Sequence, residues 1–260
     1  MFINNIFLKM IYNLMLVGMP QTANNPINKN ILYAPFNVNE KSTYINYKLN
    51  SQQLDKLSNI LKKKNNLKLI PTSLFDYQYE NKDYYLSINI YNCTSPIFDF
   101  FINEPATRCE INTYVVNRNN VKGTLIIDYI SSILSMDADK IFKKPEKIMF
   151  KNQDNKLYGK TKNKNIDLDF NIDIKYKNPK IKPILSDSLI IKTENIFYNS
   201  GIYDKVYFDS TFLKNNIIIC NNHDINFKFY DIEFNNIHSV FYFENNINFI
   251  GGMWYNIFNK

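Results

Sequence analysis

Apolar and polar residues alternate along several short stretches of this chain, most clearly over Ile166–Ile174 (IDLDFNIDI). Because successive side chains of a β-strand point to opposite faces, a period of two predicts a strand with one buried and one wet face. The 20 Phe and 19 Tyr also favour strands, since aromatic side chains pack well on a pleated surface. The sequence therefore predicts a mainly β fold.

The 260 residues suit one β-rich domain. We expect residues 1–30 to form a flexible or surface-docked segment and residues 31–260 to form the domain itself. The alternation is interrupted twice, and two or three helices are expected. One spans about 51–63, and another lies within Ser131–Lys144 and is ended by Pro145.

The net charge of +7 would attract anionic partners. Only Arg108 and Arg118 among the 31 basic residues are arginines, however, and specific recognition of nucleic acid relies on arginine forks. We therefore expect no specific nucleic-acid partner. A non-catalytic protein that binds anionic partners through its surface lysines stays open as an alternative.

The chain has three cysteines, an odd number without paired spacing, which favours a reducing, cytoplasmic location. The apolar run Met10–Met19 is too short to span a bilayer, so no membrane span is predicted. Whether residues 1–23 are a targeting segment stays open. His223 and His238 are the only histidines and lie in no ligand cluster, so no metal site and no cofactor are predicted.

The most distinctive polar pattern lies within Thr107–Val115 (TRCEINTYV). Arg108, Glu110, Asn112 and Tyr114 alternate with apolar residues and would share one side of a strand. Such a row of polar groups suits a pocket that orients a ligand. The other interpretation is a solvent-facing row of a strand whose opposite side is buried.

The order of the expected elements resembles that of the acetoacetate decarboxylase-like superfamily. The matching segments are the strand Tyr44–Leu49, a following Leu-x-x-Leu helix, Leu67–Pro71, the strand Tyr84–Tyr91, the segment Glu110–Val115 and a Pro-x-Lys motif at Pro145–Lys147. The resemblance implies a closed antiparallel β-barrel with a central cavity. It also implies Schiff-base lyase chemistry between a lysine and an oxo acid.

The resemblance implies that Glu110 takes the position of the family's active-site glutamate. The family's Pro-Lys-Lys motif reads Pro145-Glu146-Lys147 in this chain, so Glu146 stands where the nucleophilic lysine is expected. Lys147 and Lys144 are the remaining candidates for the nucleophile. A neighbouring cation favours the neutral lysine that a Schiff base needs, and a carboxylate opposes it.

The expected function is therefore the binding of a small, partly apolar carboxylate or oxo acid. Glu110, Lys147 and Lys144 are the candidate catalytic residues, and Arg108, Asn112 and Tyr114 are the candidate ligand-binding residues. The ligand's identity and assembly into a homo-oligomer are left open.

Overall fold

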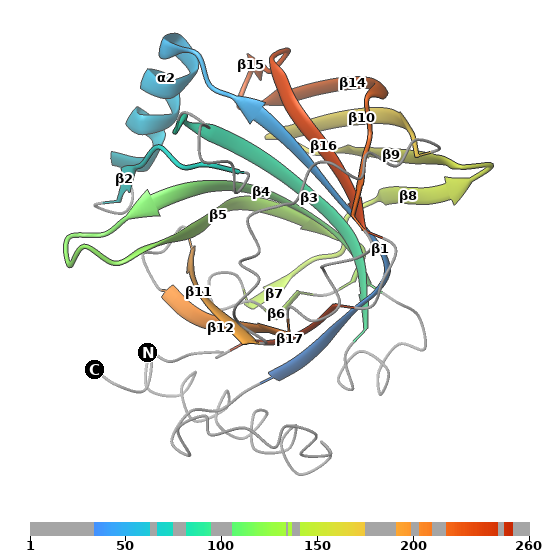
Figure 1. Ribbon diagram of the computed structural model, residues 1–260, viewed down its shortest axis with the longest axis horizontal. Helices are drawn as coiled ribbons and strands as arrows, with labels where there is room; N and C mark the ends of the chain where they lie inside the picture. The colour runs from blue at the N-terminus through green and yellow to red at the C-terminus, as the bar shows by residue number, and fades with distance from the viewer. Residues whose placement is uncertain are drawn as a thin grey trace.

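The computed structural model is mainly β (Figure 1). It describes residues 34–62, 67–74, 82–94, 106–133, 135–136, 141–174, 191–198, 203–209, 217–243 and 247–251. The predicted N-terminal segment 1–30 lies outside these ranges.

The largest sheet has ten strands in the order β13-β16-β1-β17-β12-β11-β5-β4-β2, and β3 pairs with both β1 and β4. These pairings curve the sheet strongly (Figure 1). All neighbours are antiparallel except β5 and β11. The strands are β1 (Ala34–Lys48), β2 (Lys68–Leu69), β3 (Tyr85–Thr94), β4 (Ala106–Val116), β5 (Lys122–Ser131), β11 (Ile191–Tyr198), β12 (Tyr203–Asp209), β13 (Ile217–Ile219), β16 (Ile237–Phe243) and β17 (Ile247–Gly251).

A second sheet of five strands has the order β15-β14-β10-β9-β8 and is antiparallel throughout. Its strands are β8 (Ile148–Gln153), β9 (Lys156–Lys162), β10 (Ile166–Asp173), β14 (Asn222–Phe229) and β15 (Ile232–Glu233). Asp154 and Asn155 turn the chain between β8 and β9 with φ of 53° and 60°. Two adjacent residues of positive φ form a tight hairpin turn, which Asp and Asn tolerate.

The helix α2 (Ser51–Lys62) lies close to the predicted span of 51–63. A reciprocal cap fixes its start. The Gln53 amide N–H donates to Asn50 Oδ1 at 2.9 Å, and the Asn50 amide N–H donates to Gln53 Oε1 at 3.0 Å. The Gln53 side chain also donates to the Glu233 carbonyl at 2.9 Å, which ties the helix to the five-stranded sheet.

The main hydrophobic core includes residues of the ten-stranded sheet, α2 and the five-stranded sheet. Tyr47 of β1 contacts Phe227 and Phe234, with ring centroids 5.5 and 5.8 Å apart. Leu57 of α2 and Phe170 of β10 are buried in the same core. In Figure 1, α2 and the five-stranded sheet both lie on the convex side of the large sheet.

The prediction of a closed antiparallel barrel with two or three helices is wrong. The strands form three sheets, and the largest ends at the edge strands β13 and β2 and contains a parallel pair. Alternation along a strand specifies which side chains are buried, but it does not specify which strands pair. The sequence pattern therefore could not separate one closed sheet from two packed ones.

The second predicted helix is also absent from the described residues, where α2 is the one helix. Within Ser131–Lys144 the structure has the short antiparallel strands β6 (Ser135–Met136) and β7 (Ile141–Lys143), which form a two-stranded sheet. Residues 134 and 137–140 of the predicted helix lie outside the described residues. The described residues on either side pair across strands, and the local sequence pattern does not specify such pairing.

Candidate ligand-binding site

The strands β1, β3 and β4 lie side by side and turn alternate side chains to opposite faces. One face, which includes Tyr47, meets the five-stranded sheet, and we call it the apolar face. We call the opposite side the polar face. Its residues are Ser42, Tyr44, Asn46, Ser87, Asn89, Tyr91, Arg108, Glu110 and Asn112.

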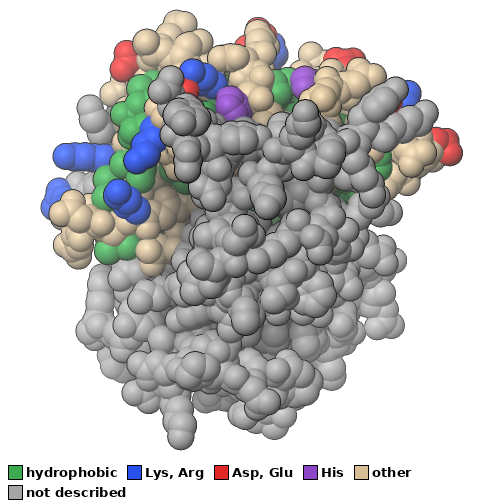
Figure 2. Space-filling model, in the orientation of Figure 1, with side chains coloured by type: hydrophobic (Ala, Val, Ile, Leu, Met, Phe, Trp, Pro, Cys, Tyr) green, Lys and Arg blue, Asp and Glu red, His purple; other side chains and the backbone are tan. Residues whose placement is uncertain are grey.

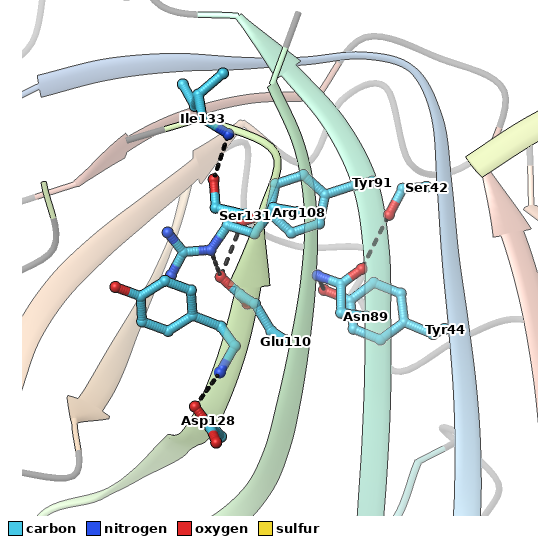
Figure 3. A network of polar contacts seen from close by, with 10 residues as sticks. Ser42, Tyr44, Asn89, Tyr91, Arg108, Glu110, Asp128, Ser131 and Ile133 are labelled. Atoms are coloured by element: carbon cyan, nitrogen blue, oxygen red, sulfur yellow. Dashed lines mark hydrogen bonds and ion pairs between the residues drawn. The ribbon is translucent and has the colours of Figure 1, made fainter. Parts of the chain in front are cut away.

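An ion pair between Arg108 and Glu110 lies on the polar face (Figure 3). Arg108 Nε–H donates to Glu110 Oε1 at 2.6 Å, and the Tyr91 hydroxyl donates to the same oxygen at 2.9 Å. The side chains of Arg108 and Glu110 are only 13% and 10% exposed. The guanidinium carbon also lies 4.2 Å from the ring centroid of Tyr129, a cation–π contact.

Both of the Glu110 carboxylate's hydrogen bonds within the described residues end on Oε1. Oε2 therefore has no protein donor in the part of the chain that the structure describes. A carboxylate held by two donors on one oxygen has a fixed orientation, and its second oxygen can still accept a hydrogen bond or a proton.

Neutral hydrogen bonds continue the polar face from β4 toward β1. Asn89 Oδ1 accepts from the Ser42 hydroxyl at 3.2 Å, and Asn89 Nδ2 donates to the Tyr44 hydroxyl at 2.9 Å (Figure 3). A parallel set connects Ser87 Oγ to Asn46 Oδ1 at 2.6 Å and Asn46 Nδ2 to Ser239 Oγ at 3.1 Å. These contacts fix the side chains of β1 and β3 beside the ion pair.

Asn112 pairs with Ser87 across β3 and β4, two residues beyond Glu110. Its side chain is buried, and its Oδ1 has no hydrogen-bond partner among the described residues. Ile126 of β5 is its neighbour on the other side. Tyr114, the last of the predicted row, is partly buried on β4, where its carbonyl accepts from the Ile70 amide at 3.1 Å.

The candidate lysines occupy a different environment. Lys144 and Lys147 are both exposed. The Glu146 amide between them donates to the Ser131 carbonyl at 2.8 Å, and Ser131 pairs with Arg108. The backbone of this segment is thus bonded to β5, and Ser131 lies between it and Arg108 of β4. The Glu146 side chain turns to the β9–β10 turn, where Asn163 donates to it at 2.9 Å.

A buried carboxylate, Asp128, links the two sheets on the apolar side. It pairs with Ile111 across β4 and β5, and its Oδ2 accepts from Asn165 Nδ2 at 2.8 Å. Burial, and then the charge of Asp128, raise the pKa of the nearby Tyr230 hydroxyl. These groups join the sheets and do not lie on the polar face.

The sequence pattern did not single out Tyr91, Asn89 or Tyr129. The signal for the first two was present, because Ser87, Asn89 and Tyr91 alternate with Leu86, Ile88 and Ile90. Joining that row to Arg108 and Glu110 required the register of β3 against β4, which pairs Asn89 with Glu110. Tyr129 lies beside Glu110 only because β5 has an irregular register there.

Within the described residues, no group of three or more His, Cys, Asp or Glu side chains is arranged to hold a metal ion. In the same part of the chain, no helix has the length and apolar character needed to cross a bilayer.

No known family model and no curated protein matches the sequence. Solved structures do match. An acetoacetate decarboxylase-like enzyme from Sphingomonas wittichii RW1 is 9% identical with a TM-score of 0.50, over 91% of this chain and 96% of that one. This chain has the acetoacetate decarboxylase-like fold. The resemblance expected from the sequence is thus confirmed at the level of the fold.

An acetoacetate decarboxylase from Legionella pneumophila is 14% identical with a TM-score of 0.49, over 89% of this chain and 90% of that chain. Another match is the enduracididine biosynthesis enzyme MppR, in a complex with the condensation product of pyruvate and imidazole 4-carboxaldehyde. It is 6% identical with a TM-score of 0.45, over 84% of this chain and 86% of that one. At such identities an acetoacetate decarboxylase-like fold does not by itself specify an activity.

Proposed function

We propose that this protein binds a small, partly apolar carboxylate or oxo acid on the polar face, at the ion pair of Arg108 and Glu110. The observation that carries the proposal is a charged pair held on a sheet face with only 13% and 10% of its side chains exposed. Removing two charges from water is costly, and a buried pair is weak evidence for stability. A role in binding accounts for the presence of the pair on this face.

The chemistry of the pair suits such a ligand. A guanidinium offers a planar fork that matches a carboxylate. Glu110 Oε2 would accept a hydrogen bond from the ligand, or its proton. The rings of Tyr91 and Tyr129 and the side chain of Ile126 supply apolar surface on the same face. Asn112 and Tyr114 lie farther along β4 and would contact the rest of the ligand.

Titration calorimetry with 2-oxohexanoate tests the proposal. Arg108→Met and Glu110→Gln should each weaken binding at least about tenfold, because a hydrogen bond to a charged group contributes about 1.5–3 kcal/mol. Arg118→Met is the matched control, since it removes the other arginine, which is exposed beyond the end of β4. Equal affinities in all four proteins would rule out the proposed site.

A Schiff-base lyase is a second candidate. It is favoured by the hydrogen bond from the Glu146 amide to Ser131, because Ser131 is the cross-strand partner of Arg108 and the Lys144–Lys147 segment is therefore held one strand away from the ion pair. Against it, both lysines are exposed and a carboxylate lies between them. Borohydride reduction in the presence of 2-oxohexanoate, followed by mass mapping, separates the two functions. An adduct on Lys147 or Lys144 would establish the lyase chemistry, and its absence with intact binding leaves ligand binding.

Binding of anionic partners through surface lysines is the remaining alternative. Figure 2 shows basic side chains at the left of the molecule, near β2 and the β4–β5 turn. Lys68 of β2, Lys122 of β5 and Arg118 between β4 and β5 are exposed. Retention on an anionic resin that falls with Arg118→Met but not with Arg108→Met would favour this function.

A further inference from the structure

We propose that the ligand of the polar face carries a neutral hydrogen-bond donor, such as a hydroxyl group, at the end remote from its carboxylate. In this inference, which rests on the proposed function, Asn112 Oδ1 accepts the hydrogen bond. The substrate class is then an ω-hydroxy oxo acid or a closely similar hydroxy carboxylate, not a plain alkyl oxo acid.

The first observation is an unsatisfied acceptor. Asn112 is 6% exposed, and its Oδ1 has no hydrogen-bond partner among the described residues. Buried side-chain oxygens in native proteins nearly always have a partner, because an unmade hydrogen bond in the interior costs the full desolvation of the group. An exception on a face that also holds the buried ion pair points to a donor from outside the protein.

The second observation concerns the donors next to Asn112. Ser87 is its direct cross-strand partner, but the Ser87 hydroxyl already donates to Asn46 Oδ1 at 2.6 Å. A hydroxyl has one proton to donate, so Ser87 cannot also satisfy Asn112. The neighbour on β5, Ile126, has no side-chain donor. Neither of its two cross-strand neighbours therefore donates a hydrogen bond to Asn112 Oδ1.

The third observation is the spacing along β4. Glu110 and Asn112 are two residues apart on the same face, and a strand rises 3.2–3.4 Å per residue, so their positions differ by about 7 Å. The charged group at Arg108 and Glu110 and the neutral acceptor at Asn112 are thus separated by the length of a short carbon chain. Ile126, beside Asn112, supplies an apolar contact for such a chain.

The test compares 2-oxohexanoate with 6-hydroxy-2-oxohexanoate, which differ by one terminal hydroxyl. We expect the hydroxy acid to bind the natural protein about fivefold to tenfold more tightly, the increment of one net hydrogen bond. In Asn112→Leu, which replaces the amide by an apolar side chain of similar size, the two affinities should become equal. For each variant the measured quantity is the ratio of its affinities for the two acids. A substitution that weakens the binding of both acids equally leaves this ratio unchanged.

Asn112→Ser is a second variant that keeps an acceptor oxygen, and it should retain part of the hydroxyl preference. Equal binding of the two acids by the natural protein would overturn the inference and leave the proposed function standing. A preference that survives in Asn112→Leu would also overturn it, because another group would then recognise the hydroxyl. Failure of both acids to bind would remove the proposed function and this inference together.

Discussion

The two faces of strand β3 are built on opposite chemistry. Leu86, Ile88 and Ile90 on the apolar face are fully buried and belong to the main core. Ser87 and Asn89 on the polar face are also buried, but they are held by hydrogen bonds to β1. Burial of apolar side chains stabilises a fold directly. The hydrogen bonds of buried polar groups add little net stability, because the cost of removing these groups from water offsets most of the gain. The contrast indicates that the apolar face determines stability, while the polar face carries the proposed binding site.

The largest loss of stability should come from Ile88→Ala on the apolar face. Deleting a fully buried isoleucine side chain removes transfer free energy and leaves a cavity, so the free energy of unfolding should fall by about 2–5 kcal/mol. Asn89→Ala changes the adjacent residue on the polar face and removes two hydrogen bonds, so it should cost less, about 1–2 kcal/mol. Urea denaturation of both variants measures the difference, and equal losses would contradict the division between the faces.

Gly159→Ala tests the packing of the sheet that covers the apolar face. A Cβ on Gly159 would lie 2.0 Å from Cε1 of Phe170, its cross-strand partner. The ring must therefore shift, and overpacking of this kind costs about 1–3 kcal/mol. Adding Phe170→Leu should relieve the clash, so the double variant should lose less stability than the sum of the single losses. Additive losses would show that the ring is not held against the glycine.

Cys220 is buried in the main hydrophobic core, so the pH dependence of the free energy of unfolding reports on its burial. Burial raises the pKa of this thiol from 9.0 to about 12. The unfolded chain therefore ionises first, and stability should fall as the pH rises from 9 toward 12. At pH 10 the contribution of Cys220 to this loss should be about 1 kcal/mol. Denaturation at pH 7.5 and pH 10 should show a smaller loss for Cys220→Ala than for the natural protein. An identical pH dependence would show that the thiol titrates normally.

Asn112→Leu should have the smallest effect on stability. Replacing a buried amide whose oxygen has no partner removes an unsatisfied polar group, so stability should stay constant or rise by up to about 1 kcal/mol. The thermal midpoint of unfolding measures this change. A loss comparable to that of Ile88→Ala would mean that Asn112 supports the fold and not a ligand.

The sequence predicted the strand faces well, because alternation alone specifies them. The row of Arg108, Glu110 and Asn112 lies on one face of β4 as expected, and Glu110 is buried. The helix from Ser51 was also predictable, since Asn50 and Gln53 cap it locally. These features depend on neighbours in the chain.

The remaining features depend on contacts between distant residues. The pairing of β3 with both β1 and β4, and the separate five-stranded sheet, follow from tertiary packing and not from any local pattern. For the same reason the sequence could not reveal that Tyr91 and Tyr129 hold the ion pair. The exposure of Lys144 and Lys147 depends on where the Glu146 amide and side chain bind, namely at Ser131 and Asn163.

The NMR spectrum of the arginine Nε–H groups directly tests whether a ligand binds at Arg108. The chain has only two arginines, so the spectrum should contain two such signals. That of Arg108 should be distinctive, because its Nε–H donates to Glu110 at 2.6 Å, while the exposed Arg118 serves as an internal reference. Addition of 2-oxohexanoate should shift the Arg108 signal with a saturable dependence on concentration and leave the Arg118 signal in place. An unchanged Arg108 signal at concentrations where calorimetry detects binding would show that the ligand binds elsewhere on the protein.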